Sequence, residues 1–212
     1  MEYGDIVFYH VFNKSIFGNI FNEDRDFERF KKTMIFYSYK ENFTPSYKIF
    51  SKSKDQSNFL NYTKGQTKII NIISYCLMPN HFHILISEAK NYLSRYLNKL
   101  LDSYTKYFNI KYGRKGPLWQ SRTKKILLDK DSYFIHLTRY IHLNPVTAYL
   151  TEKPENWKFS SYHEYINSKE EICEYKRYFP ENYDFKTEYR KFVEDRIDYQ
   201  RNLKEIEYLI KE

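Results

Sequence analysis

The chain has 212 residues, a formal net charge of +8 and only two cysteines, Cys76 and Cys173. This length can bury a hydrophobic core, and two cysteines are too few for the disulfide framework of a small secreted domain. No apolar run is long enough to cross a membrane and no signal peptide opens the sequence, so we expect a cytoplasmic protein without membrane contact.

Charge is unevenly distributed along the chain. Residues 1–150 contain 23 Lys and Arg against 12 Asp and Glu, a net +11, whereas residues 151–212 are net −3. A basic body of this kind favours a polyanionic partner such as nucleic acid. The 23 tyrosines add rings that suit stacking on single-stranded bases, although an AT-rich genome would also account for this composition.

The first half of the chain alternates strand-like and helix-like patterns. We expect a strand at 5–12, a helix at about 23–40 behind the candidate cap Asn22, a polar loop or hairpin insertion at 41–66, and a strand at 68–77. Pro79-Asn80 then makes a tight turn into a third strand. These two strands are therefore expected to form an antiparallel hairpin.

The second half is richer in helical spacing. We expect a helix at about 90–110, strand-like pieces at 118–120 and 125–128, a helix from Asp131 to about Asn144, short helices at 151–180, and one or two amphipathic helices at 185–211. Pro145 disfavours helical geometry at the residue before it, so Asn144 is predicted to end its helix.

This element order predicts an α+β fold with a ferredoxin-like antiparallel sheet, packed helices and the hairpin at its centre. Residues 1–165 are interpreted as one domain with an insertion at about 41–66. Residues 166–212 are interpreted as a mostly helical C-terminal extension, whose amphipathic segment 185–211 would serve as a partner helix, a dimer element or a cover for the sheet.

The hairpin carries the motif His81-Phe82-His83 at the start of its second strand. Side chains alternate faces along a strand, so both imidazoles point to one side and Phe82 to the other. Two neutral imidazoles on one strand can form half of a metal site. The alternative is two histidines on a solvated strand face, and the motif alone does not decide between them.

A second candidate pair is Tyr140 and Asn144 on the helix that begins at Asp131. Residues four apart lie on one face of a helix, so the phenol and the amide are neighbours. The alternative is a partly buried tyrosine and a helix-ending asparagine before Pro145. His142 lies between them in sequence and points elsewhere, and we interpret it as structural or DNA-contacting.

The segment from Ser103 to Leu128 holds seven basic residues and no acid. Its candidate DNA-binding residues are Arg114, Lys115, Trp119, Arg122, Lys124 and Lys125. Cations beside a tryptophan and two glycines suit a phosphate backbone and its bases, whereas the alternative is a solvated surface.

Taken together, the motifs resemble the REP-associated tyrosine transposases, a branch of the single-tyrosine HUH transposases. The similar segments occur in family order and cover roughly residues 5–165: Tyr9–Asn13, Met78–His83, Gly116–Arg122, Tyr140–Val146 and Trp157–Tyr162. The insertion at 41–66 is longer than the family pattern, and 170–212 lie outside the resemblance.

The resemblance implies a role for each matching residue. His81, His83 and Asn144 would bind a divalent metal ion, Mg²⁺ or Mn²⁺, and Tyr140 would be the nucleophile. The protein would nick and rejoin hairpin-bearing or palindromic single-stranded DNA through a 5′-phosphotyrosine intermediate. It would act in the bacterial cytoplasm, associated with the nucleoid, and assembly as a monomer or a homodimer is left open.

Imidazole ligands suit Mn²⁺ better than Mg²⁺, which prefers oxygen. Two other functions remain open on the same fold. A domesticated, non-catalytic module would bind DNA hairpins without cleaving them. A metal-dependent phosphodiesterase would cleave with water and form no covalent adduct with the protein.

Overall fold

The structure is a computed structural model that describes residues 7–43, 47, 63–88, 91–128 and 131–202. Most of the insertion predicted at 41–66, and the end of the helical segment predicted at 185–211, lie outside the described residues. Within the described ranges, no helix is both long and apolar enough to cross a membrane.

The strands and helices follow the predicted order. The strands are β1 (Val7–Lys14), β2 (Ile70–Met78), β3 (His81–Glu88) and β4 (Lys124–Leu128). The α-helices are α1 (Asp24–Tyr37), α4 (Leu93–Lys111), α5 (Asp131–Thr147), α6 (Tyr162–Ile166) and α7 (Arg190–Glu194). Single helical turns η1 (Lys40–Phe43), η3 (Pro154–Asn156), η4 (Lys176–Tyr178) and η5 (Phe185–Tyr189) complete them.

The four strands form one sheet in the order β2-β3-β1-β4, with every neighbouring pair antiparallel. This is the ferredoxin-like arrangement, so the predicted fold class is confirmed. The expectation of a central hairpin is only half right, because β3 is central but β2 lies at the edge. That edge is nevertheless covered, since Leu77 N–H donates to the Phe159 carbonyl and Glu174 N–H donates to the Ile72 carbonyl.

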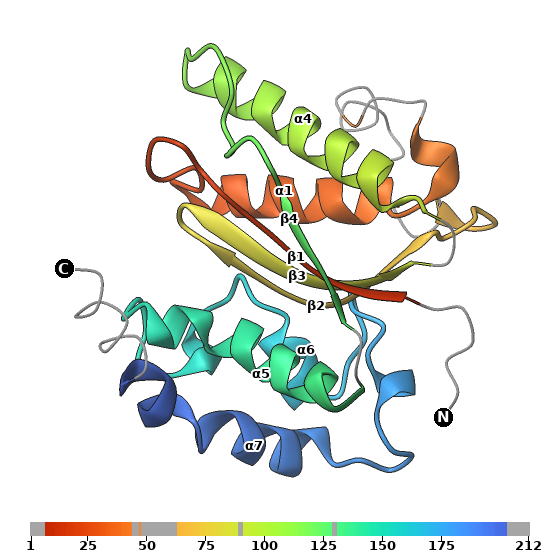
Figure 1. The fold of residues 1–212 in the computed structure, drawn as a ribbon, viewed down its shortest axis with the longest axis vertical. Helices are drawn as coiled ribbons and strands as arrows, with labels where there is room; N and C mark the ends of the chain where they lie inside the picture. Colours follow the sequence, from red (N-terminus) through yellow and green to blue (C-terminus); the bar gives the residue numbers. More distant parts are fainter. Residues whose placement is uncertain (1–6, 44–46, 48–62, 89–90, 129–130, 203–212) are drawn as a thin grey trace.

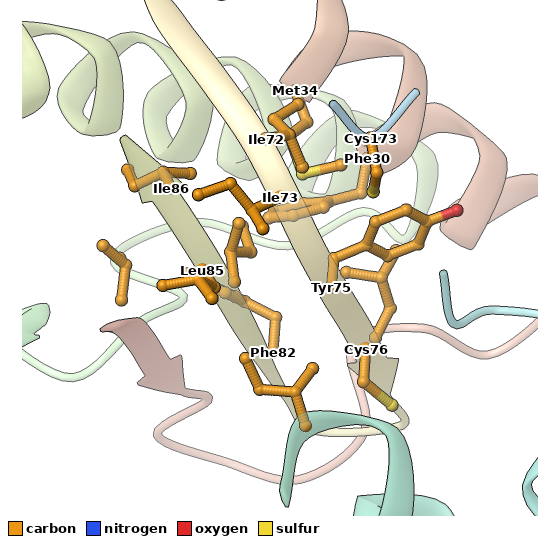
Figure 2. Close-up of a cluster of buried hydrophobic side chains, with 14 of the residues drawn as sticks. Phe30, Met34, Ile72, Ile73, Tyr75, Cys76, Phe82, Leu85, Ile86 and Cys173 are labelled. Carbon is orange, nitrogen blue, oxygen red and sulfur yellow. The ribbon is translucent and has the colours of Figure 1, made fainter. Parts of the chain in front are cut away.

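The sheet separates two layers of helices (Figure 1). Helices α1 and α4 lie over one face, and α5, α6 and α7 lie over the other. The hairpin contributes apolar side chains to this core, among them Ile72, Phe82, Leu85 and Ile86 (Figure 2). Phe82 faces the first layer, where its ring lies 5.2 Å from that of Phe30 in α1.

The N-cap of helix α1 lies one residue later than predicted, because it is Glu23 rather than Asn22. The buried Asp26 side chain accepts the N–H groups of both residues, at 3.0 Å from Asn22 and 3.3 Å from Glu23. It also accepts the Tyr112 hydroxyl at 2.6 Å and pairs with Lys111 at 2.5 Å. These bonds fasten the start of α1 to the end of α4.

Helix α5 does not end at Asn144, contrary to the prediction from Pro145. It continues to Thr147 with Pro145 inside its last turn. The hydrogen bonds that follow the proline still form, from Ala148 N–H to the Asn144 carbonyl and from Leu150 N–H to the Pro145 carbonyl. Because Pro145 removes only one donor near the end of the helix, the helix tolerates it.

The C-terminal region packs on α5 and on the sheet of its own chain. A cluster of buried rings fills this layer: Tyr162, Tyr165, Tyr175, Phe179, Phe185 and Tyr189. The described part of this region therefore covers α5 and the β2 edge. Within it η5 continues into α7, and residues 197–202 are helical again, which agrees with the one or two helices predicted from residue 185 onward.

His142 joins α5 to this cover. Its side chain is fully buried, with Nδ1 2.8 Å from the Tyr189 hydroxyl and Nε2 2.8 Å from the Ser161 hydroxyl. Ser161 Oγ in turn accepts the Tyr75 N–H of β2 at 2.8 Å. Of the two predicted roles for His142, the structure therefore supports the structural one. Burial lowers its pKa to about 3.

We predict that this histidine makes folding sensitive to acid. The pKa of His142 is about 3 in the folded chain and about 6.5 when unfolded, so its contribution is complete above pH 6.5 and is lost as the pH falls toward 3. Urea unfolding of the wild type and His142→Gln at pH 7, 5.5 and 4.5 should show a smaller acid-induced loss of unfolding free energy in the variant. An equal loss in both proteins would contradict this assignment.

Candidate active site

The two histidines of the motif lie on the face of the sheet that α5 covers. In the strand register Phe12 of β1 is opposite His83, and Lys14 is opposite His81. Directly opposed residues share a face, so these four side chains line one side of the sheet. The rings of His81 and His83 are 5.2 Å apart between centroids and nearly perpendicular.

His83 is fixed by a third histidine, His10 of β1. His10 Nε2 lies 3.0 Å from His83 Nδ1, and their rings are stacked 5.2 Å apart. Burial lowers the pKa of His10 to about 4. Burial is the main cause that holds the pKa of His83 well below its usual value, and the nearby His10 and His81 add to it. Both rings are therefore neutral at pH 7, and in the tautomer in which His83 Nδ1–H donates to His10, His83 Nε2 is an unprotonated ligand atom.

Tyr140 reaches these rings from α5. Its ring stands edge-on to His83 at 5.5 Å and to His10 at 6.0 Å between centroids. Its side chain is 41% exposed, so solvent and a large ligand can reach it. The structure thus places α5 on the histidine face and brings Tyr140 and the histidines together within a single chain.

Asn144 lies one turn after Tyr140 and is tied to it. Its Nδ2 donates to the Tyr140 carbonyl at 2.9 Å, which leaves Oδ1 for another partner. On the other side of the pair, His81 Nδ1 lies 2.6 Å from the Asn80 side-chain oxygen. Asn144 and His81 are thus each held in place by one hydrogen bond to a nearby residue, Asn144 by the Tyr140 carbonyl and His81 by Asn80.

The donor set fits a divalent metal with open positions. It offers two imidazoles on one face and an amide oxygen on the adjoining helix. Within the described ranges, no three His, Cys, Asp or Glu side chains are grouped to hold a metal ion. A closed structural zinc site is therefore not formed by those residues, and further ligands would come from water or a bound phosphate.

The predicted DNA-binding cations are divided between the two faces of β4. Lys124 is opposite Phe12 and so lies on the histidine face, whereas Lys125 lies on the other face and donates to Ser94 of α4 at 2.9 Å. Arg122 is exposed just before β4. Lys14, which the sequence did not single out, is exposed beside His81.

Arg114 and Lys115 lie in the loop after α4. Lys115 is exposed. The Arg114 guanidinium is partly engaged within the chain, since Nη2 donates to the Pro117 carbonyl at 2.8 Å. Arg114 therefore also stabilises the loop that presents it.

Trp119 occupies the core rather than the surface. It is only 8% exposed, and its ring lies 5.4 Å from Phe82 and 5.9 Å from Phe30. Its short bridge to Ser15 closes the end of β1. The side chain that sequence composition suggested for base stacking thus faces the helical layer of α1 and α4.

His10 is the residue of the site that the sequence interpretation missed. Its signal was present, since His10 and Phe12 alternate on the predicted first strand as His81 and His83 do on the third. The ferredoxin-like order sets these strands side by side. The register, which sequence does not provide, pairs His10 with Leu85 and Phe12 with His83, so that His10 meets His83 diagonally across the two strands.

Comparisons with known proteins agree with the motifs. The family model "Transposase IS200 like" matches residues 46–144, a segment that contains the histidine pair, Tyr140 and Asn144. A protein of Haemophilus influenzae named as a REP-associated tyrosine transposase is 27% identical over 109 residues. That match covers 46% of this chain and 61% of the relative, less than two thirds of its length.

A solved structure, described as that of the REP-associated tyrosine transposase bound to a REP hairpin, also matches. The identity is 16% and the TM-score 0.49, over 84% of this chain and 90% of that one. The family model and the Haemophilus influenzae relative confirm the resemblance predicted from the sequence motifs: residues 46–144 are similar to the IS200-like transposases, and the chain is similar to a REP-associated tyrosine transposase.

Proposed function

We propose that the protein is a transposase that cuts and rejoins single-stranded DNA bearing hairpins, with Tyr140 as its nucleophile. The observation that carries the proposal is the approach of Tyr140 to His83, at 5.5 Å between rings, from a helix on the opposite side of the site. The hairpin-bearing DNA is the partner that the resemblance to the REP-associated tyrosine transposases implies.

In the proposed reaction the Tyr140 oxygen attacks the scissile phosphorus. The new bond joins Tyr140 to the 5′-phosphate, the bond from phosphorus to the 3′-oxygen breaks, and the phenol proton passes to solvent. The leaving oxygen takes up a proton and becomes a free 3′-hydroxyl. Attack by another 3′-hydroxyl reverses these changes and joins the strands, so no nucleotide cofactor is required.

The proposed metal ligands are His81, His83 and Asn144, with Mn²⁺ or Mg²⁺ as the ion. When bound there, such an ion would supply charge neutralisation at the non-bridging phosphate oxygens, which would lower the barrier for attack by a phenol, whose ordinary pKa is about 10. The lowered pKa of His83 supports this role, because only a neutral imidazole is a ligand. His10 would support this role by accepting the Nδ1–H of His83, because that tautomer leaves Nε2 of His83 unprotonated.

Replacement of the nucleophile tests the reaction class. Tyr140→Phe should abolish the covalent protein–DNA adduct that the wild type forms with a hairpin-bearing single strand and Mn²⁺, as measured by denaturing gel electrophoresis. Tyr149→Phe is the matched control, because Tyr149 is an exposed tyrosine just beyond the same helix and should not alter the adduct. Cleavage without any adduct would indicate a water-using phosphodiesterase, and hairpin binding without cleavage would indicate a non-catalytic module.

Metal affinity tests the role of His10 separately from cleavage. His10→Phe keeps a ring against Phe12 but removes the nitrogen that meets His83, so Mn²⁺ affinity should fall about 10- to 100-fold in titrations followed by electron paramagnetic resonance. His136→Phe is the control, because His136 is exposed on α5. Unchanged Mn²⁺ affinity in His10→Phe would show that His83 needs no such support.

The face of β4 on which a lysine lies determines whether it can contact the phosphate backbone. Lys124→Ala should reduce the salt dependence of single-strand affinity by about 0.7, the share of one phosphate contact, because Lys124 lies on the histidine face. Lys158→Ala should leave it unchanged, since Lys158 pairs with Asp24. Fluorescence anisotropy over a series of salt concentrations measures both, and an equal slope in all three proteins would exclude Lys124 from the path.

A further inference from the structure

The loop that follows β1 presents two large apolar side chains to solvent. Ile16 is 49% exposed and Phe17 is 46% exposed. The loop is held in place by its backbone, since Ser15 N–H donates to the Asn80 carbonyl at 2.8 Å and Ile16 N–H donates to the Leu118 carbonyl at 3.1 Å. The exposure of Phe17 is therefore a fixed property of this loop.

A cation lies against the Phe17 ring. The Arg114 guanidinium carbon is 4.0 Å from the ring centroid, a cation–π contact. Two hydrogen bonds fix the guanidinium, from Nη1 to Asn109 Oδ1 at 3.1 Å and from Nη2 to the Pro117 carbonyl at 2.8 Å. The pair thus forms a rigid aromatic and cationic surface before any ligand arrives.

This surface lies at the end of the sheet that carries the histidine motif. Lys14, three residues before Phe17, is opposite His81, and Ser15 is bonded to Asn80 in the hairpin turn. In Figure 1 the loop after β1 and the turn between β2 and β3 lie at the same end of the sheet. Three residues span at most about 11 Å between Cα atoms, so Phe17 lies near the site.

We propose that Phe17, backed by Arg114, is a stacking platform for an unpaired nucleobase of the DNA strand that enters the active site. The inference rests on the proposed function, because it assumes that the chain handles single-stranded DNA. Its partner follows from charge, since Lys14, three residues before Phe17, and Lys115, next to Arg114 in the chain, are both exposed cations. An exposed ring with cations near it in the chain fits a base and the phosphates beside it.

The path of the strand follows from the faces involved. Phe17 lies on the α4 side of the sheet end, with its ring 5.9 Å from that of Phe108. His81 lies on the α5 side. A strand that runs from one to the other crosses the end of β1 at Lys14. Phe17 would thus hold a base outside the site while the next phosphates reach the histidines.

The test measures binding of a short single-stranded oligodeoxythymidylate to the full chain, carrying Tyr140→Phe so that no cleavage occurs. Phe17→Ala should weaken binding about tenfold, within the range that base stacking contributes. Phe17→Tyr should retain binding. Ile16→Ala is the matched control, because Ile16 is equally exposed in the same loop but has no ring.

An oligomer of the same length with abasic positions separates stacking from other causes. It keeps the phosphates, so Phe17→Ala and its parent should bind it equally. An equal loss with both oligomers, or no loss with either, overturns the platform while leaving the proposed function intact. If the parent protein binds no single strand at all, both the platform and the proposed function fail.

Discussion

The site depends on the alternation of side chains along β3. One strand places Phe82 against Phe30 in the layer of α1 and α4, and His81 and His83 on the face of α5. Burial of the apolar residues therefore fixes the direction of the imidazoles. A shift of one residue in register would bury the histidines in the wrong layer and expose the phenylalanine, so the core enforces the site.

Burial also sets the chemistry of these histidines. His10 and His83 contact each other inside the face that α5 covers, and their pKa values fall because the charged form loses its water. The same burial that stabilises the fold keeps these rings uncharged, which is the form in which the proposed ligand His83 would bind a metal. Because protonation of these buried rings is unfavourable, the fold loses stability in acid, and His142 adds to this loss.

Much of the arrangement could be predicted from sequence because it depends on local patterns. The alternation at His81-Phe82-His83 and the four-residue spacing of Tyr140 and Asn144 are properties of one strand and one helix. The contact of His10 with His83 depends on the register between two strands 73 residues apart, which no local pattern encodes. Pro145 misled the prediction because a proline near the end of a helix removes a single donor. Trp119 misled it because composition does not distinguish an exposed ring from a buried one.

The C-terminal region explains how Tyr140 can be both exposed and well oriented. Tyr140 itself meets solvent, so its own packing cannot fix the helix that carries it. The opposite side of α5 supplies that support, since His142 is bonded to Tyr189 of the cover and to Ser161, which is bonded to β2. The aromatic cluster around Tyr189 packs against α5 and holds it on the sheet. A segment beyond the matched transposase residues thus supports the helix that carries Tyr140, the proposed nucleophile.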